Sequence, residues 1–321
     1  MNHFGAFLVT FASLSALIVL TSRGYHIYGR LVGPKSHLRL TLFVVGLGIT
    51  IGTFFGPLPD LGHQYFFVHQ IEHFAARLLG PMLIALSRPG GWLAAGLSRG
   101  WRREITKALR SPAVRAMRSP VAATLLLILS LYIWQVPAIY AFALNSEMVE
   151  FAAHFSMTAA GLSYFSAVFG PGGLVGGWPY GARLLTAFVV IVSNILLGAL
   201  ITLKETSLYS SAPSTFSDVA RFALSDETTG GYVIWVPSSM IMIVTILLII
   251  NGWNKFEEVQ WQGRHNRRGS NSAALEFPET AFELKLKTAG PNRRMGRTLA
   301  IGSLSMFAIV LTTAITVLQL Y

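Results

Sequence analysis

The stretch Tyr65–Ser87 has the sequence YFFVHQIEHFAARLLGPMLIALS, which combines a length sufficient to cross a bilayer with ionisable side chains. About 20 helical residues at about 1.5 Å rise span the roughly 30 Å of hydrocarbon. Ionisable groups inside a membrane are costly, so they usually face a protein interior and mark function. His69, His73 and Arg77 follow each other at i, i+4 and i+8, which predicts one polar stripe on a helix face. Glu72 lies beside this stripe.

The composition is that of a polytopic membrane protein. The chain has 321 residues, 53% of them hydrophobic and 12% charged, with a mean hydropathy of +0.54. The net charge of +11 at first suggests a protein that binds nucleic acid. We exclude a nucleic-acid partner because the basic residues gather in the predicted loops on one side of a lipid bilayer. The chain has no cysteine, which excludes disulfides and thiolate metal sites.

Eight apolar runs predict an all-α transmembrane bundle of about eight spans in a single integral membrane domain. The first run lacks a preceding positive charge, so we expect a retained helix and not a cleaved signal peptide. The runs are Phe4–Thr21, Leu40–Leu58, Tyr65–Ser87, Val121–Ala141, Met148–Phe169, Arg183–Leu203, Gly231–Asn251 and Thr298–Leu320.

The basic residues predict the orientation of these spans. All but three of the 25 Lys and Arg residues fall in the loops that alternate to one side, the exceptions being Arg77, Lys204 and Arg221. Positively charged loops stay in the cytoplasm, so both termini are predicted outside and Gly252–Arg297 is predicted to be a cytoplasmic loop. Within the inner loops, Trp101–Arg118 could form a basic amphipathic helix on anionic headgroups, but we favour ordinary solvated charge.

Three histidines are predicted to converge near the outer side of the membrane. His69 and His73 enter from outside on one span and lie about 6 Å and 12 Å deep, at 1.5 Å per residue. His154, on the fifth span, lies at about 9 Å by the same rule. An H-x-x-x-H pair is a two-point metal clamp that a third histidine from another helix completes.

Further donors surround this predicted metal site. Met157 shares the helix face of His154, and His63 lies in the short loop above. Glu72 stands three residues after His69 and could orient an imidazole. Histidine with methionine suits copper, whereas histidine with carboxylate suits zinc or iron. The simpler alternative is that each histidine only bonds across helices.

Arg77 and Asn194 leave more than one interpretation open. Arg77 could pair with Glu72 or another carboxylate, or it could face an anionic ligand, which would speak against a bare cation nearby. Asn194 in the sixth span is better explained as a hydrogen-bonding contact between helices than as part of a site.

Several short motifs occur in a specific order along the chain. Together they resemble the CtaG-type cytochrome c oxidase assembly factors, which are bacterial polytopic membrane proteins, from about Tyr28 to Asn251. The motifs are HQIEH at 69–73 with GPMLIALSRP at 80–89, WQVPAIY at 134–140, His154 with AGL at 160–162, and DETTGGYVIWVP at 226–237.

The resemblance implies a protein of the bacterial inner membrane that assists assembly of a haem–copper oxidase and is not an enzyme. Copper would be its metal, held on the outer side, with an oxidase subunit and a periplasmic copper chaperone as partners. His69, His73, His154 and Asp226 carry over as functional positions. The family's histidine pair usually has the form H-M-x-Q-H, whereas Gln70 and Glu72 stand here, and Arg77 occupies a usually apolar place.

Two other functions fit the same histidines. In an electron-transfer membrane subunit, His154 with His69 or His73 would ligate a haem b, and Arg77 would meet a propionate. In a copper transporter, a polar path would continue to the inner side. The predicted lower halves of the helices offer little polarity beyond Asn194 and Lys204, so the sequence favours the assembly factor.

Overall fold

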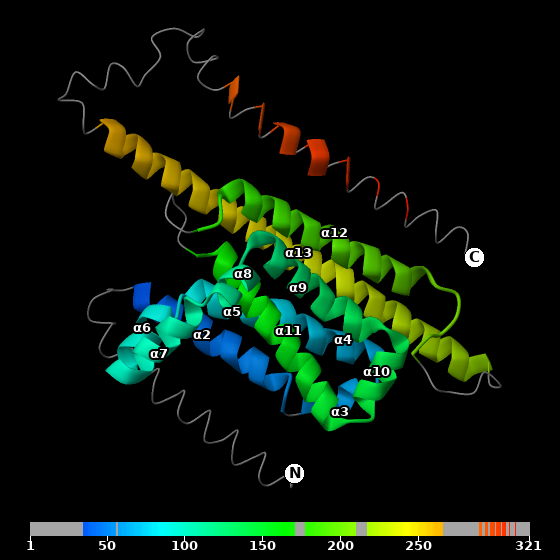
Figure 1. Ribbon diagram of the computed structural model, residues 1–321. Coiled ribbons are helices and arrows are strands. Elements are labelled where there is room, and N and C mark those ends of the chain that lie inside the picture. The colour runs from blue at the N-terminus through cyan, green and yellow to red at the C-terminus, as the bar shows by residue number, and fades with distance from the viewer. Residues whose placement is uncertain are drawn as a thin grey trace.

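A computed structural model describes residues 35–55, 57–170, 177–209 and 217–265, together with scattered helical residues between 289 and 312. The predicted first span, Phe4–Thr21, lies outside the described residues, as do most of Gly252–Arg297 and much of Thr298–Leu320. The described residues form helices and connecting turns with no strand among them, in agreement with the predicted all-α class (Figure 1).

The described helices follow each other with short connections. They are α2 (Lys35–Gly52), α3 (Pro57–Gly62), α4 (Phe66–Phe74), the π-helix η1 (Ala75–Leu79), α5 (Gly80–Ser87), α6 (Gly90–Gly96), α7 (Arg99–Leu109), α8 (Pro112–Met117), α9 (Pro120–Tyr132), the 3₁₀-helix η2 (Ile133–Gln135), α10 (Pro137–Leu144), α11 (Glu147–Val168), α12 (Tyr180–Leu203) and α13 (Ser217–His265).

Two described helices are long and apolar enough to cross a membrane by themselves. They are α12 and, within α13, Arg221–Val259. A third span is obtained if the bent pair α9–η2 and α10 counts as one. These helices indicate a membrane protein, and α12 and α13 lie side by side along much of their length (Figure 1).

Two of the predicted runs are not single straight helices. The run Val121–Ala141 bends by 76° between Gln135 and Pro137. Val136 is extended there, with ψ of 122°, because a residue before proline is pushed out of the helical region. The run Leu40–Leu58 also divides, since α2 ends at Gly52 and α3 starts at Pro57.

The predicted Tyr65–Ser87 segment is helical from Phe66 to Ser87, and it changes geometry at its centre. α4 continues directly into the π-helix η1 and then into α5. A π-helical turn inserts one extra residue and is often found at functional sites. Here it contains Arg77, one turn beyond His73, so the change of phase falls where the polar stripe meets the apolar half of the helix.

Small residues allow the neighbouring helices to approach this central segment closely. A Cβ at Gly161 of α11 would collide with the backbone oxygen of Arg77 and the ring of Pro81. A Cβ at Gly80 would likewise meet Thr50 of α2. Such small residues are the usual means of close helix packing in membranes. The Ala160–Leu162 motif therefore places α11, which carries His154, against η1 and α5.

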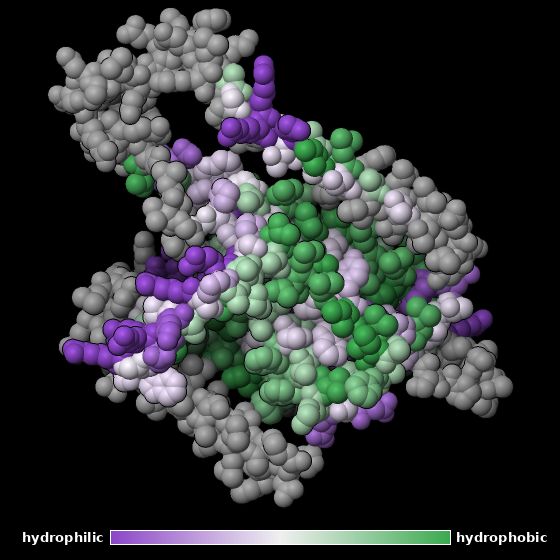
Figure 2. Space-filling model, viewed as in Figure 1, coloured by the Kyte–Doolittle hydropathy of each residue, from purple (hydrophilic) through white to green (hydrophobic). Residues whose placement is uncertain are grey.

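The two ends of the bundle differ in character. α6 and α7 lie at one end, and α3 and α10 lie at the other (Figure 1). The largest apolar cluster includes Leu78, Leu127 and Phe165 and extends from η1 towards the α6–α7 end. Figure 2 shows a broad hydrophobic surface over the middle of the molecule, with hydrophilic side chains towards its ends. This pattern is that of a bundle surrounded by lipid.

Candidate metal centre

Three imidazoles from two helices meet inside the bundle. The ring centroids of His69 and His73 on α4 are 4.3 Å apart, and those of His73 and His154 on α11 are 5.5 Å apart. The His69 and His154 centroids are separated by 6.0 Å. All three residues are 2% exposed. A tetrahedral ion bound about 2 Å from each nitrogen would hold such rings about 5 Å apart, so this spacing is compatible with a shared ion.

Two buried carboxylates join the imidazoles. Ligand atoms of His69, Glu72 and Glu150 all lie within 4.8 Å of one another, which makes these residues a possible metal-binding group among the described residues. The Nδ1 of His69 is 3.3 Å from Oε2 of Glu72, without the geometry of a hydrogen bond. Glu72 is completely buried. The centre therefore offers oxygen ligands as well as nitrogen.

Several polar atoms of this centre have no hydrogen-bond partner among the described residues. Buried polar groups are normally hydrogen-bonded, and one left without a partner costs about 1–3 kcal/mol. A cation bound between these atoms would remove that penalty, so the set fits a metal ion. The atoms are His69 Nδ1, both carboxylate oxygens of Glu72, Glu150 Oε1 and His154 Nε2.

His63 connects the centre to the surface of the described structure. Its Nε2 lies 2.9 Å from Oε2 of Glu150, and its side chain is 42% exposed whereas that of Glu150 is only 12% exposed. Glu150 thus contacts the half-exposed His63 through one oxygen and belongs to the buried group through its carboxylate. The arrangement forms a line of donors from the surface to His69.

Two glutamine side chains fix the position of His73. Nε2 of Gln135 donates to Oε1 of Gln70 at 2.5 Å and lies 3.4 Å from Nδ1 of His73. Gln70 and Gln135 are both buried. Partners of this kind orient a ligating imidazole through the nitrogen that does not face the metal. The Gln70 of the HQIEH motif therefore acts through Gln135.

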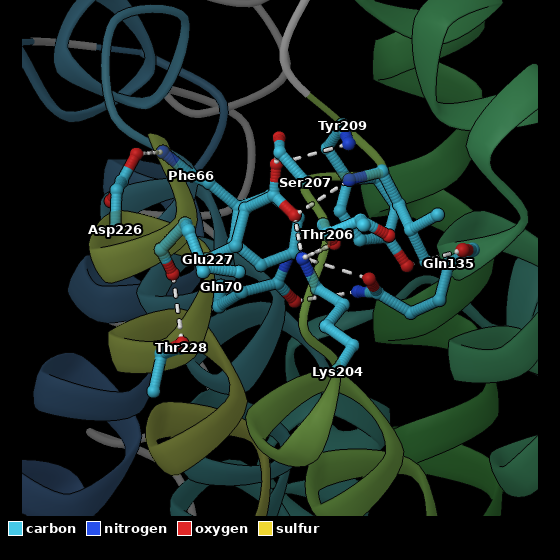
Figure 3. Close-up of polar contacts among 12 residues, drawn as sticks. Phe66, Gln70, Gln135, Lys204, Thr206, Ser207, Tyr209, Asp226, Glu227 and Thr228 are labelled. Atoms are coloured by element: carbon cyan, nitrogen blue, oxygen red, sulfur yellow. Dashed lines mark hydrogen bonds and ion pairs between the residues drawn. The ribbon is translucent and has the colours of Figure 1, made fainter. Parts of the chain in front are cut away.

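The connection between α12 and α13 is fastened by Glu227, as Figure 3 shows. The carboxylate of Glu227 accepts hydrogen bonds from the Lys204 ammonium and the Ser207 hydroxyl. It also accepts the backbone amides of Leu208 and Tyr209, each at 3.0 Å. These four donors lie within Lys204–Tyr209, directly after α12, so the Glu227 carboxylate of α13 holds that segment against its own helix.

Tyr209, held in that segment, packs behind Tyr140, which contacts His69. Its ring stacks on Phe66 at 4.5 Å and meets Tyr140 at 5.1 Å, and Tyr140 contacts His69 at 5.2 Å. Its hydroxyl donates to the backbone oxygen of Gln135 at 2.8 Å. Burial raises the pKa of the Tyr209 hydroxyl, and the Glu227 carboxylate raises it further. The hydroxyl therefore stays a donor at neutral pH.

Asp226 supports the start of α4. Its two oxygens accept the backbone amides of Phe66 at 2.8 Å and Phe67 at 3.1 Å. Those amides have no partner within their own helix, and a carboxylate at a helix N-terminus is favoured by the helix dipole. The structure thus places Asp226, predicted as a functional position, beneath the helix that carries His69 and His73, and not among the convergent donors.

Arg77 lies one turn beyond the imidazoles. Its guanidinium donates to Oδ1 of Asn194 at 2.8 Å and to the backbone oxygen of Leu127 at 3.3 Å. No carboxylate lies within ion-pair distance of Arg77 among the described residues, so the ion pair with Glu72 is absent there. Asn194 bonds between helices, as its sequence position predicts.

Sequence reasoning named most of the centre and missed one ligand candidate. The structure brings His69, His73, His154 and Glu72 together and places His63 at the edge. Met157 is completely buried one turn further along α11. Glu150 was not among the donors that the sequence analysis named. Its spacing of four residues before His154 was the available signal, because i and i+4 share one helix face.

Comparison with known proteins agrees with this reading of the sequence. A family model described as "Cytochrome c oxidase caa3 assembly factor (Caa3_CtaG)" matches residues 16–255. The chain belongs to this family. The match confirms the resemblance seen in the motifs and covers every residue of the candidate metal centre. An assembly factor family implies a non-catalytic role and interaction with cytochrome c oxidase. No curated protein matches the chain, and no solved structure does.

Proposed function

We propose that this protein binds a copper ion at its buried imidazole–carboxylate centre and assists insertion of that ion into a haem–copper oxidase. His69, His73 and His154 supply imidazole ligands, and Glu72 and Glu150 supply carboxylate oxygens. By donor type alone, imidazole with carboxylate also suits zinc or iron, so the choice of copper rests on the family's description as cytochrome c oxidase assembly factors. With no thiolate in the set, the divalent copper ion fits better than the reduced one. Bound copper would be the cargo, so no reaction is catalysed.

One observation carries the proposal: five buried polar atoms of His69, Glu72, Glu150 and His154 have no hydrogen-bond partner among the described residues. The ligand atoms of the first three residues lie within 4.8 Å of one another, and the His154 ring lies 6.0 Å from that of His69. Two neighbouring supports keep the place rigid. Asp226 holds the start of α4, and Gln135 orients His73. Unsatisfied groups on a rigid frame are the expected form of a binding site for a cation, since the ion replaces the missing donors.

His63 and Glu150 provide the route by which the ion reaches His69. The half-exposed imidazole is the first donor, and the Glu150 carboxylate shares an ion between the surface and the buried ligands. The ion can pass from His63 to Glu150 and then to His69 by short ligand exchanges. It leaves by the reverse route towards a docked oxidase subunit, so loading and delivery occur from one side.

The packing below the centre favours a holder over a transporter. A cation moving further inward would meet the Arg77 guanidinium and then the apolar side chains of Leu78, Leu127 and Phe165. A buried positive charge repels cations strongly in a low-dielectric interior. The ion therefore has one favourable exit, which is the side from which it arrived.

The ring contacts also favour a single ion over haem b. The three imidazoles pack against one another, with His69 and His73 only 4.3 Å apart between centroids. A porphyrin needs a flat slot between its two ligating rings. In either candidate pair, His154 with His69 or His154 with His73, the third imidazole packs against both rings instead. We expect the purified protein to show no Soret absorption band. A stoichiometric haem b spectrum that vanishes in His154→Ala would replace this proposal.

The cellular test uses the oxidase as the reporter. In cells expressing His73→Ala/His154→Ala, the oxidase subunit should be made in normal amount but contain little copper, and added copper should partly restore it. The matched control is His37→Ala, which removes an exposed histidine of α2 outside the centre and should leave oxidase copper unchanged. Normal oxidase copper in a strain that lacks all three clustered histidines would contradict the proposal.

A further inference from the structure

A second surface of the molecule separates basic from apolar side chains on one helix. α7 has no buried residue. Along the helix, Trp101, Ile105 and Leu109 occur at intervals of four and are 68%, 41% and 52% exposed. Residues at i, i+4 and i+8 lie on one helix face. α7 therefore presents an apolar stripe that no described part of the chain covers.

The opposite face of α7 is strongly basic and slightly hollowed. At 100° per residue, Arg99, Arg103, Lys107 and Arg110 lie on the face opposite the apolar stripe, and Arg102 lies at its edge beside Leu109. Among the described residues, no carboxylate comes within ion-pair distance of these side chains. The hollow has a volume of about 390 Å³ and is lined by Arg99, Arg102, Arg103, Thr106, Lys107 and Arg110.

The position of α7 keeps it next to the apolar bundle. It follows α5 through the short helix α6, and it precedes α9 through the short helix α8. Trp178 donates to the backbone oxygen of Arg118, which ties the end of α8 to the start of α12. Figure 2 shows hydrophilic side chains gathered at this end, beside the hydrophobic surface of the bundle. α7 thus lies at the border between the hydrophilic end of the molecule and its hydrophobic surface.

We infer that α7 lies in the membrane interface and that its basic hollow binds the headgroups of anionic phospholipids. Trp101, Ile105 and Leu109 enter the acyl region, while the guanidinium groups meet lipid phosphates. Tryptophan is favoured at this depth. Charge complementarity selects anionic over zwitterionic lipid, because several cations within one Debye length act together on a negative surface. This inference is independent of the metal centre.

The depth of the stripe can be measured directly, since the chain has no native cysteine. Ile105→Cys and Arg103→Cys are labelled with a nitroxide in the full-length protein. The proteins are placed in nanodiscs of phosphatidylcholine containing about a third phosphatidylglycerol. The label at 105 should be relaxed by oxygen and shielded from a water-soluble relaxant, and the label at 103 should show the reverse. A water-exposed label at 105 would overturn the inference and indicate a protein partner instead.

Lipid selectivity is tested with two matched triple variants. Arg103→Gln/Lys107→Gln/Arg110→Gln removes three charges from the hollow. The control Arg115→Gln/Arg118→Gln/Lys255→Gln removes three exposed charges near the same end and leaves the hollow intact. After extraction and washing, phosphatidylglycerol retained per protein should fall several-fold in the first variant and stay near the parent value in the control.

Two results would overturn the lipid assignment. Equal phosphatidylglycerol retention by the parent and both variants would show that the hollow does not select lipid. Displacement of the lipid by a few millimolar inorganic phosphate would show that it is a site for free phosphate. The far-ultraviolet circular dichroism of each variant confirms that the helices remain, so loss of lipid is not loss of fold.

Discussion

Glu227 and Glu72 are two buried glutamates in opposite situations. Glu227 is 2% exposed and receives four hydrogen bonds, one of them from the ammonium of Lys204. Glu72 is completely buried, and neither of its oxygens has a hydrogen-bond partner among the described residues. Burial of a carboxylate is equally expensive in both places. The first carboxylate is therefore satisfied by the fold itself, and the second has two unsatisfied oxygens, which the proposed cation would bind.

The two residues show that one membrane bundle contains a buried carboxylate that stabilises the fold and another that belongs to the candidate metal centre. The Glu227 carboxylate fastens the loop that carries Tyr209, and its donors come from nearby in the chain. The Glu72 carboxylate has imidazoles and a second carboxylate as neighbours, which are metal ligands and not donors matched to it. Neutralising Glu227 should therefore lower the free energy of unfolding. Neutralising Glu72 should raise it and should weaken metal binding.

The largest effect is expected for Glu227→Gln. The substitution keeps the shape but leaves the buried Lys204 ammonium without its counter-charge. Breaking one partner of a buried ion pair typically lowers the free energy of unfolding by about 3–5 kcal/mol. The measurement is reversible unfolding of the purified protein in detergent. Glu205→Gln, at an exposed neighbour, is the control and should change little. If the free energy of unfolding fell by less than about 1 kcal/mol in Glu227→Gln, the Glu227 carboxylate would not be the stabilising group described above.

Glu72→Gln should act in the reverse sense. A neutral amide is cheaper to bury than an unpaired carboxylate, so the metal-free protein should gain about 1–3 kcal/mol of unfolding free energy. Copper affinity should fall at least tenfold, as for loss of a ligand or its close support. Both quantities come from unfolding and titration of the same preparation. Destabilisation of the metal-free protein would mean that Glu72 already has a structural partner.

Asp226→Asn should give the smallest change. The amide retains one acceptor oxygen for the amides of Phe66 and Phe67 but loses the charge that favours the helix N-terminus. Losses of such caps lower stability by about 0.5–2 kcal/mol. Metal stoichiometry should stay at the parent value. A variant of parental stability that no longer binds metal would instead make Asp226, one of the functional positions implied by the family resemblance, a metal ligand.

The sequence was sufficient for the helical class and for the convergence of the histidines. His69 and His73 share a face because α4 is regular, and depth counting works for α11 because that helix is continuous. The sequence was insufficient where the backbone departs from an ideal straight helix. The bend before Pro137 and the π-helical turn at Arg77 shift the phase of side chains by local backbone changes that hydropathy does not register.

Contacts between distant segments were also beyond the sequence. Asp226 is 160 residues from Phe66, and Gln135 is 65 from Gln70. Each carries an ordinary polar side chain whose role depends on which helices are neighbours. Glu150 shows the same limit, since a glutamate in the first turn of an outer helix is usually solvated, and its burial depends on packing against His63 and His69.

The most direct test of the metal centre is a competitive copper titration of the parent protein and its histidine variants. The parent should bind one ion, and each of His69→Ala, His73→Ala and His154→Ala should lose most of the affinity. His73→Ala/His154→Ala should be little worse than either single change, because ligands of one ion act as a unit. Folded variants that bind copper as tightly as the parent would contradict the account.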